Sequence, residues 1–345
     1  MHLKDSVRFL PSRALSVKFV DPHILLLAKG DHTMSLQLLN LDLEVVDRVA
    51  AFRGSKGFIL LASDDEFLLS IDDKLVLVKG GASKVVLKAS NPTNVFWHAV
   101  RADGRVFVHE YGSPPTGIYV SEDLERWSRL INNTDIDKRS KHFHCIAHDP
   151  YRGWLIATLG DACLTRVAVS EDLRSWRPLY EGPWQFVPIE VLEDRIVFGM
   201  DSGIARGGIG VYNPENDRWD FTFLKWHDGE VRFAQMCDLK RLDNGIWIAT
   251  LGTPQAVIVS RDLKTWYAAY VEGFDKRFNY NMSIAEGKNF VACSTGNNLL
   301  IFEKGELAEL ARGAQQVLVA YKAYIDRLKG FGFVLKKLFV ELPIT

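Results

Sequence analysis

The sequence of 345 residues is poor in cysteine, has no long apolar run and carries no excess of either charge. The four cysteines form no Cys-x-x-Cys pair, which excludes a zinc ribbon and a small disulfide-stapled fold. With 42 basic against 43 acidic residues, the formal charge is -1, so a nucleic-acid partner is not expected. No 18-residue apolar stretch and no signal-peptide pattern is present. We therefore expect a cytoplasmic protein whose thiols are reduced and mostly buried.

What the sequence does contain is an internal repeat. Three segments match closely, and a fourth keeps the spacing with asparagine in place of serine: VSEDLERW (120–127), VSEDLRSW (169–176), VSRDLKTW (259–266) and VYNPENDRW (211–219). Their anchors follow one another at intervals of 43 to 49 residues. A fixed period of this length is typical of one supersecondary unit per repeat.

Each repeat predicts two short strands joined by a tight turn. Serine and aspartate side chains accept hydrogen bonds from nearby backbone N–H groups, and the tryptophan would pack beside the turn. Around these anchors, each unit contains four short strands separated by turn signals. Seven such units, including weaker copies near the start and a last one after 278, predict an all-β propeller over residues 1–305. Six blades is the alternative.

The Ser-x-Asp-x-x-x-Trp units resemble the Asp-box, or BNR, repeats of sialidase-like propellers, with Leu124, Leu173 and Leu263 where glycine is usual. The segments HEYG (109–112), HFHCIAHDP (142–150), GD (160–161) and MDS (200–202) resemble a poorly characterised, glycosyl-hydrolase-like group of BNR-repeat proteins over roughly residues 95–270. This resemblance implies a propeller fold. Because propellers host unrelated functions, the function has to be argued from individual residues.

Polar residues are expected to converge on one mouth of the central channel. In a propeller the first strand of each blade starts at the face where the second strand ends, and the Ser-x-Asp turns lie on the opposite face. The candidate carboxylates at that mouth, which could support glycoside hydrolysis, are Glu110, Asp161 and Asp201. The candidate ligand-binding residues are His98, His142, His144, Arg166, Arg206 and Arg232. His148, at the far end of its strand, is expected to be a turn residue.

Three interpretations of the mouth remain open from the sequence. It could be a hydrated channel, a site for a carbohydrate or acidic sugar, or a metal site. A ring of histidine, arginine and carboxylate suits a hydroxylated ligand with a carboxylate of its own. His98, His142 and His144 with Gln185 or Gln235 would suit a divalent metal, similar to the manganese site of oligogalacturonate-lyase-like propellers. No cofactor is otherwise expected.

Two further functions were weighed. Classical sialidase chemistry would require three arginines and a tyrosine, for which Arg166, Arg206, Arg232 and Tyr280 are the counterparts, but the Phe/Tyr-Arg-Ile-Pro motif is absent. A non-catalytic scaffold would instead hold a protein partner on rim loops or on the C-terminal tail. We expect a carbohydrate-type ligand that the mouth could also hydrolyse, with a protein-interaction scaffold or a metal-dependent, polysaccharide-lyase-like enzyme as the alternatives.

After Glu306 the apolar pattern changes to that of a helix. One stripe runs from Leu307 to Leu328, and after Gly330 a second runs from Phe331 to Phe339. We predict a helical extension over 306–345 that caps the propeller. A homo-oligomer contact is the alternative, and membrane attachment is disfavoured because the second stripe is faced by only two lysines.

Overall fold

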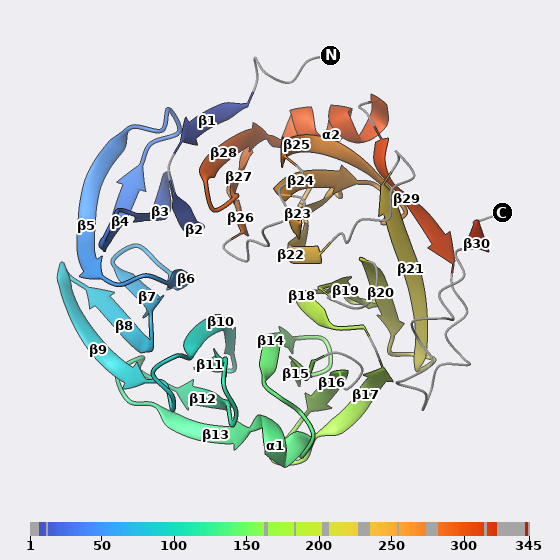
Figure 1. Ribbon diagram of the computed structural model, residues 1–345, viewed down its shortest axis with the longest axis horizontal. Coiled ribbons are helices and arrows are strands. Elements are labelled where there is room, and N and C mark those ends of the chain that lie inside the picture. The colour runs from blue at the N-terminus through green and yellow to red at the C-terminus, as the bar shows by residue number, and fades with distance from the viewer. Residues whose placement is uncertain are drawn as a thin grey trace.

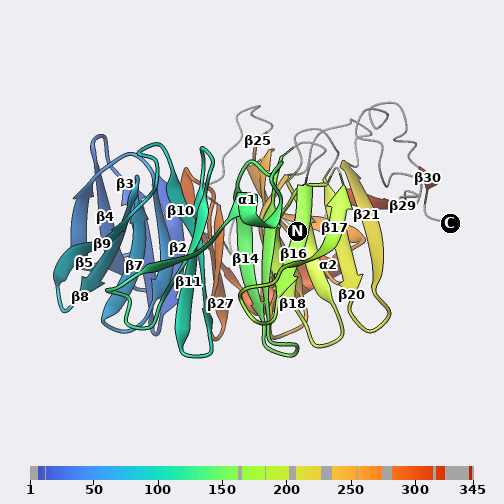
Figure 2. The ribbon, with the colours of Figure 1, turned by 90° about the horizontal axis from the view of Figure 1, so that it is seen from below.

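The protein is a ring of seven antiparallel, four-stranded blades in the computed structural model (Figure 1). The structure describes residues 7–11, 13–161, 165–182, 184–201, 207–226, 235–253, 255–273, 282–313, 316–322 and 342–343. The predicted seven-bladed propeller is therefore confirmed. Seen from the side, the strands of each blade run along the axis of the ring (Figure 2).

Six blades are built from four consecutive strands each. Blades 1 to 3 contain β2 (Ala14–Val20), β3 (His23–Lys29), β4 (Thr33–Leu39) and β5 (Val45–Arg53); β6 (Gly57–Ala62), β7 (Glu66–Ile71), β8 (Lys74–Lys79) and β9 (Ala82–Lys88); β10 (Val95–Ala102), β11 (Arg105–Tyr111), β12 (Gly117–Ser121) and β13 (Ser128–Asn132). Blades 4 to 6 contain β14 (Phe143–Asp149), β15 (Trp154–Leu159), β16 (Thr165–Ser170) and β17 (Arg177–Gly182); β18 (Phe186–Val191), β19 (Ile196–Met200), β20 (Gly208–Asn213) and β21 (Arg218–Trp226); β22 (Gln235–Arg241), β23 (Trp247–Thr253), β24 (Gln255–Ser260) and β25 (Thr265–Gly273).

The seventh blade joins the two ends of the propeller. It contains β26 (Ser283–Glu286), β27 (Phe290–Ser294) and β28 (Asn298–Glu303) from late in the chain, and β1 (Arg8–Pro11) as its outer strand. Strand β1 pairs antiparallel with β28, from Arg8 opposite Ile301 to Pro11 opposite Asn298. The N-terminal strand thus closes the ring, which pairs an edge of blade 7 that would otherwise be open.

Apolar side chains pack between neighbouring blades rather than in one central core. The first strands β2, β6, β10, β14, β18, β22 and β26 surround the centre (Figure 1). One cluster joins blades 4 and 5 through Trp184, Phe186 and Phe198, each of which is at most 2% exposed. Among the described residues the thiols of Cys145, Cys237 and Cys293 are buried, as expected; Cys163 lies outside them.

The Ser-x-Asp turns have the predicted geometry. In the turn between β16 and β17, the Asp172 carboxylate accepts the backbone N–H groups of Arg174 and Ser175 at 2.8 and 2.7 Å. These bonds from backbone N–H groups hold the pKa of Asp172 low, at about 2. The same contacts recur in the turns of blades 3 and 6, at the face opposite the predicted mouth. These turns are scaffold.

The leucines that replace glycine in these turns adopt a left-handed backbone. Leu124, Leu173 and Leu263 have φ angles of 61°, 63° and 63°. The carbonyl of Leu124 accepts the indole N–H of Trp127 at 2.9 Å, and that of Leu263 accepts the indole of Trp266 at 3.2 Å. Leu124 is only 4% exposed and packs between blades 2 and 3. Burial of the side chain offsets the backbone strain.

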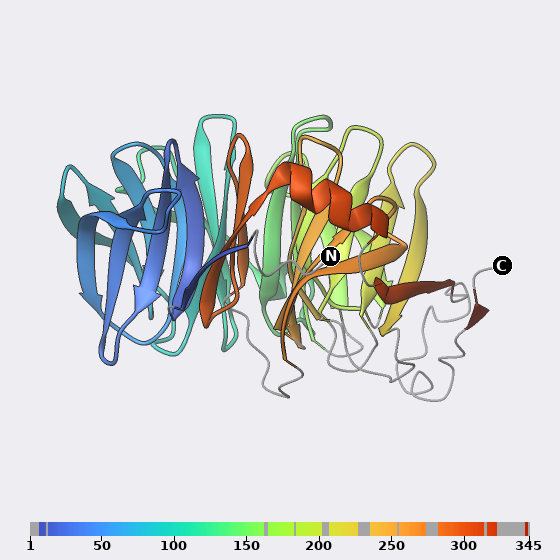
Figure 3. The same cartoon turned by 90° about the horizontal axis from the view of Figure 1, so that it is seen from above.

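The C-terminal extension begins as the predicted helix and then departs from it. Helix α2 (Lys304–Gly313) lies on the outer side of the ring, where Leu307 and Leu310 pack against blades 6 and 7 (Figure 3). The helix was predicted to continue through Leu328, but Gln316–Lys322 form strand β29, which pairs with both β21 and β25. Two open outer edges offer a hydrogen-bond ladder on each side, which outweighs helical periodicity.

A two-residue strand, β30 (Leu342–Pro343), pairs with β29. The second predicted stripe, Phe331 to Phe339, lies outside the described residues. The division at residue 305 therefore stays a prediction. In the described part of the chain no helix combines the length and the apolar character needed to cross a membrane.

Because Leu124 has a left-handed backbone, glycine should be tolerated better than alanine at this position, whereas in helices and strands alanine is the more stable of the two. Leu124→Ala should lower the free energy of unfolding by about 2–5 kcal/mol, because a buried leucine is lost. Leu124→Gly should be more stable than the alanine variant by about 1 kcal/mol, because glycine adopts a positive φ without strain. Urea unfolding followed by tryptophan fluorescence measures both. A glycine variant less stable than the alanine variant would contradict this account of the turn.

Candidate functional site

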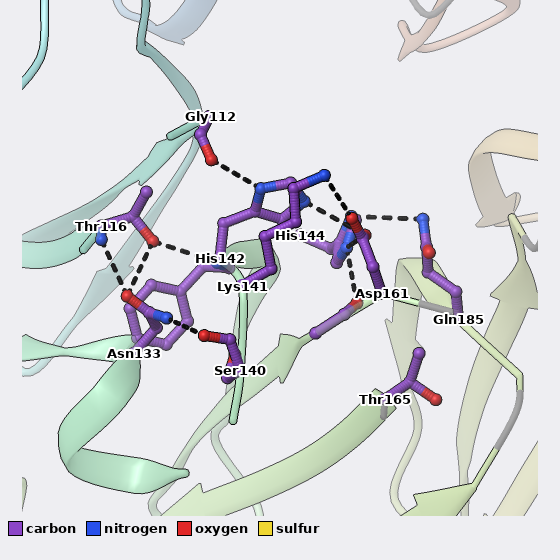
Figure 4. Close-up of polar contacts among 12 residues, drawn as sticks. Gly112, Thr116, Asn133, Ser140, Lys141, His142, His144, Asp161, Thr165 and Gln185 are labelled. Carbon is purple, nitrogen blue, oxygen red and sulfur yellow. Dashed lines mark hydrogen bonds and ion pairs between the residues drawn. The ribbon is translucent and has the colours of Figure 1, made fainter. Parts of the chain in front are cut away.

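Two histidines and an aspartate meet at the mouth of the channel, where β14 begins and β15 ends (Figure 4). The Nε2 atoms of His142 and His144 lie 3.3 and 3.0 Å from the same oxygen, Oδ1 of Asp161. His142 and His144 are 3% and 1% exposed. The structure thus brings together three of the residues that the sequence placed at the mouth.

A β-bulge directs His144 toward Asp161. Phe143 lies opposite Leu159 and Cys145 opposite Thr158, so His144 is the extra residue of the strand pair. A bulge of this kind re-aims a side chain. His142 precedes the first residue of β14, so the two histidines converge through the bulge and not through simple strand alternation.

Asp161 is an ionised carboxylate held by two donors, His144 and Lys141. Burial alone would raise the pKa of Asp161, but hydrogen bonds from its neighbours outweigh it and hold that pKa far below its usual range. Lys141 Nζ lies 2.6 Å from Oδ2, the carboxylate oxygen that the histidines do not share. Burial lowers the pKa of His144, so its ring is neutral at pH 7.

A buried polar network fixes the start of β14 (Figure 4). It runs from the loop before β12 to helix α1 (Asn133–Ile136). Asn133 Oδ1 accepts the N–H of Thr116 at 2.8 Å, and Asn133 Nδ2 donates to the Ser140 carbonyl at 2.8 Å. The Thr116 hydroxyl in turn accepts the N–H of Phe143 at 3.3 Å. Because Asn133 and Thr116 are fully buried, these bonds hold the histidine segment in place.

Glu110 supports the mouth without joining the histidine cluster. Its buried carboxylate accepts hydrogen bonds from the N–H and hydroxyl of Ser90, at 2.8 and 2.6 Å, from Asn94 Nδ2 at 2.7 Å, and from Tyr119 OH at 3.1 Å. The oxygens predicted to act on a substrate are thus engaged in ordering loops. Glu110 is a positioning residue in this geometry.

The loop ordered by Glu110 reaches His142 through Gly112. Asn94 also bonds both the N–H and the carbonyl of Ser113. Gly112 has a φ of 138°, and a Cβ there would collide with the side chain of Asn94. The Gly112 carbonyl lies 2.7 Å from His142 Nδ1. Since a carbonyl only accepts, His142 carries its proton on Nδ1.

Arg166 is committed to protein carboxylates. Its guanidinium lies 2.9 Å from Asp137 and 3.0 Å from Glu181, and the residue is 5% exposed. The sequence predicted that it would clamp a ligand, whereas the structure directs it to the contact between blades 3 and 4. A buried guanidinium needs carboxylate partners. Asp137 comes from the segment after helix α1 and Glu181 from strand β17, and these two positions are not related by the repeat.

Asp201 lies near the cluster of His142, His144 and Asp161, but unlike Asp161 it is protonated at pH 7. It is 6% exposed, and burial raises the pKa of Asp201 to about 8. Hydrogen bonds from Gln235 and Gln185 oppose the shift, and the negative charge of Asp161 adds to it. The mouth therefore holds one ionised and one protonated carboxyl group at pH 7.

His98 forms a separate pair with His109. Its Nδ1 lies 3.1 Å from His109 Nε2, and the rings stack with centroids 5.4 Å apart. Burial lowers the pKa of His98 to about 3, so the pair is neutral. His98 was expected among the metal ligands; among the described residues only His142, His144 and Asp161 group as ligand atoms.

The remaining candidates lie elsewhere. His148 is within β14, opposite Leu155 at the end away from the cluster, and not in the turn as predicted. Arg206, Arg232 and Tyr280 fall outside the described residues.

A pocket of about 340 Å³ opens beside the cluster. Its aromatic wall is formed by Phe58, Trp97 and Tyr111, and its polar wall includes Lys56, Lys141 and His142. The Tyr111 ring lies 4.6 Å from that of Trp97 and 4.4 Å from that of His142, measured between centroids. These aromatic residues and lysines were not predicted from the sequence, although Trp97 adjoins His98 and Tyr111 lies within HEYG.

No protein-family model matches the sequence, and no curated relative matches it. Solved propellers match its fold. The WD40 β-propeller domain of Doa1 is 12% identical, with 87% of this chain and 97% of that chain covered and a TM-score of 0.59. Virginiamycin B lyase from Staphylococcus aureus is 10% identical, with 86% and 98% covered and a TM-score of 0.59. At such low identity these likenesses show the β-propeller fold alone.

The raised pKa of Asp201 predicts a pH dependence that one substitution should remove. A carboxyl group whose pKa is raised on folding binds more protons in the folded state, so its contribution to stability falls as pH rises from about 4 to 8. Asp201→Asn keeps the shape of the protonated group and cannot ionise. The stability of the wild type relative to the variant should therefore fall across this window. The difference in the free energy of unfolding should change by at most about 1.4 kcal/mol per pH unit, and the difference in Tm should fall with it.

Thermal unfolding in the presence of EDTA, from pH 4 to pH 8, makes this comparison. A difference in Tm that stays constant or grows with pH would show that Asp201 ionises normally in the folded protein.

Proposed function

We propose that the mouth of the channel binds a small polyhydroxylated ligand that carries a carboxylate, such as an acidic sugar unit of a glycan. The observation that carries this proposal is the pocket of about 340 Å³, with an aromatic wall facing two lysines and a histidine. Ligand pockets combine apolar and aromatic walls with a few polar groups that fix orientation. Tyr111 and Trp97 offer ring surface to the apolar face of a sugar.

The charges of the pocket favour an anionic group. Lys56 and Lys141 both line it, and no carboxylate is among the described residues that line it. Asp161 pairs with Lys141 through Oδ2 just outside the pocket. An ammonium is a point charge that attracts a carboxylate without demanding a fixed geometry, so two lysines suit an acidic sugar whose orientation is set by the aromatic wall.

The protonation states of Asp161 and Asp201 also support hydrolysis of a bound glycoside. In glycoside hydrolysis a protonated carboxyl group donates to the leaving oxygen while an ionised one acts as base or nucleophile. Asp201, with a pKa of about 8, would be the donor and Asp161 the anion. The resemblance of the repeats to Asp-box propellers agrees with a carbohydrate ligand. We place binding first and hydrolysis second, because Glu110 is engaged in ordering loops.

Binding is tested with a panel of neutral, uronate-containing and sialylated oligosaccharides, followed by calorimetry on those retained. Lys56→Ala should weaken binding of acidic glycans at least about tenfold, a change of about 1.4 kcal/mol, because one of two pocket charges is lost. Binding of neutral glycans should change little. Lys264→Ala, in a turn at the opposite face, is the matched control.

A protein that retains no glycan, or one for which Lys56→Ala and Lys264→Ala behave alike, would contradict the proposal. Such a result would favour the competing function as a protein-interaction scaffold.

A further inference from the structure

We propose that His142, His144 and Asp161 form a binding site for a first-row divalent transition-metal ion. The site can be tested separately from the glycan proposal, because its three ligand residues do not include Lys56 or Trp97, which glycan binding requires. Its three ligand atoms lie within 4.8 Å of one another. Ligands held 2.0–2.2 Å from one ion lie roughly 2.9–3.5 Å apart. The separations of 3.3 and 3.0 Å between each Nε2 and Oδ1 match that spacing.

The first argument is an unpartnered nitrogen. His142 donates Nδ1–H to the Gly112 carbonyl, so Nε2 is the nitrogen of this ring that is left to bind a cation. This atom is buried and has no hydrogen-bond partner. It faces a carboxylate oxygen of Asp161 3.3 Å away. Two electron-rich atoms at this distance require a cation between them, either a proton or a metal ion.

The second argument is the support behind each ligand. Metal-binding histidines usually donate the other ring N–H to a carbonyl, which orients the ring and fixes the tautomer. Gly112 supplies that carbonyl to His142. Behind His144, the Gln185 amide lies 3.4 Å from Nδ1. In this structure His144 Nε2 carries the proton, because it lies 2.8 Å from the Gly160 carbonyl as well as 3.0 Å from Asp161. Rotation of the Gln185 amide would present its oxygen to Nδ1, so that the proton moves to Nδ1 and Nε2 can bind a metal.

The third argument is that the coordination positions of the ion left open by the protein lie beside the pocket. His142 belongs both to the three-residue group and to the wall of the pocket. Three protein ligands leave coordination positions for water or for a ligand oxygen. Two imidazoles and one carboxylate suit zinc, manganese or iron(II) better than calcium or magnesium, which prefer oxygen. Asp201 would remain the protonated group of the mouth.

One charge opposes the ion. Lys141 Nζ pairs with Oδ2 of Asp161 and brings a positive charge close to the site. The lysine side chain is 57% exposed, so it can move away, and it does not occupy Oδ1. Removing this charge should therefore strengthen metal binding, which a simple cluster of hydrogen bonds would not predict.

The test is calorimetric titration of the full chain, stripped with EDTA, with Zn²⁺ and with Mn²⁺. The wild type should bind one ion per chain. His144→Ala and Asp161→Asn should weaken binding at least about 100-fold, while Gln185→Ala should weaken it about 10- to 100-fold. Lys141→Met should bind several-fold more tightly than the wild type. His148→Ala, on the same strand but outside the cluster, should bind like the wild type.

Folding of each variant is checked by near-ultraviolet circular dichroism, and a rise in Tm on adding Zn²⁺ gives a second readout. A gain of affinity in Lys141→Met cannot arise from misfolding. The proposal is overturned if the wild type takes up no ion, or if Asp161→Asn binds as tightly as the wild type. The cation between His142 and Asp161 would then be a proton. Either result leaves the glycan proposal standing, because Lys56 and Trp97 act there without a metal.

Discussion

Closure of the ring by β1 on β28 is the constraint on which the remaining geometry depends. Four residues near the start of the chain complete a blade whose other strands come about 290 residues later. Because every blade packs against two neighbours, this pairing fixes the spacing of all seven inner strands. The convergence of β10, β14 and β18 on one mouth follows from it. The functional groups lie far from the closing strand, yet their mutual distances rely on it.

At the mouth the second constraint is the charge of the Asp161 carboxylate. The Asp161 carboxylate is partly buried and is stabilised by its neighbours: Lys141 brings a positive charge, and His144 donates a hydrogen bond. Supporting interactions reach outward from this charge: Gly112 orients His142, and Asn94 and Glu110 hold the loop that carries Gly112. The site is therefore built on the ends of rigid strands, with loops fixed by buried hydrogen bonds.

The sequence predicted the blades well because each repeat encodes its own turn. Asp172 and its counterparts act on N–H groups two and three residues away, so their role is visible in a local motif. Strand β1 was missed, since RFLP carries no repeat signature and its partner is distant. The helix predicted through Leu328 was wrong at β29 for a similar reason: the edges of β21 and β25 that pair with it are not encoded locally.

The site was predicted in position but not in detail. Strand ends correctly placed His142, His144 and Asp161 together, and they placed Glu110 at the same face. Whether a polar residue is available to a ligand depends on which protein groups it already contacts. Glu110 is bonded by Ser90, and Arg166 is paired with Asp137. Both partners come from segments outside the repeat motif, so the sequence did not reveal these contacts. The bulge at His144 is also a product of strand pairing and not of any local motif.

The most direct test of the central claim, that this mouth is a ligand site, is a crystal structure of the full chain grown with a uronate-containing oligosaccharide. We predict sugar density against Trp97 and Tyr111, with the carboxylate near Lys56. Density on the opposite face, among the Ser-x-Asp turns, would contradict the account.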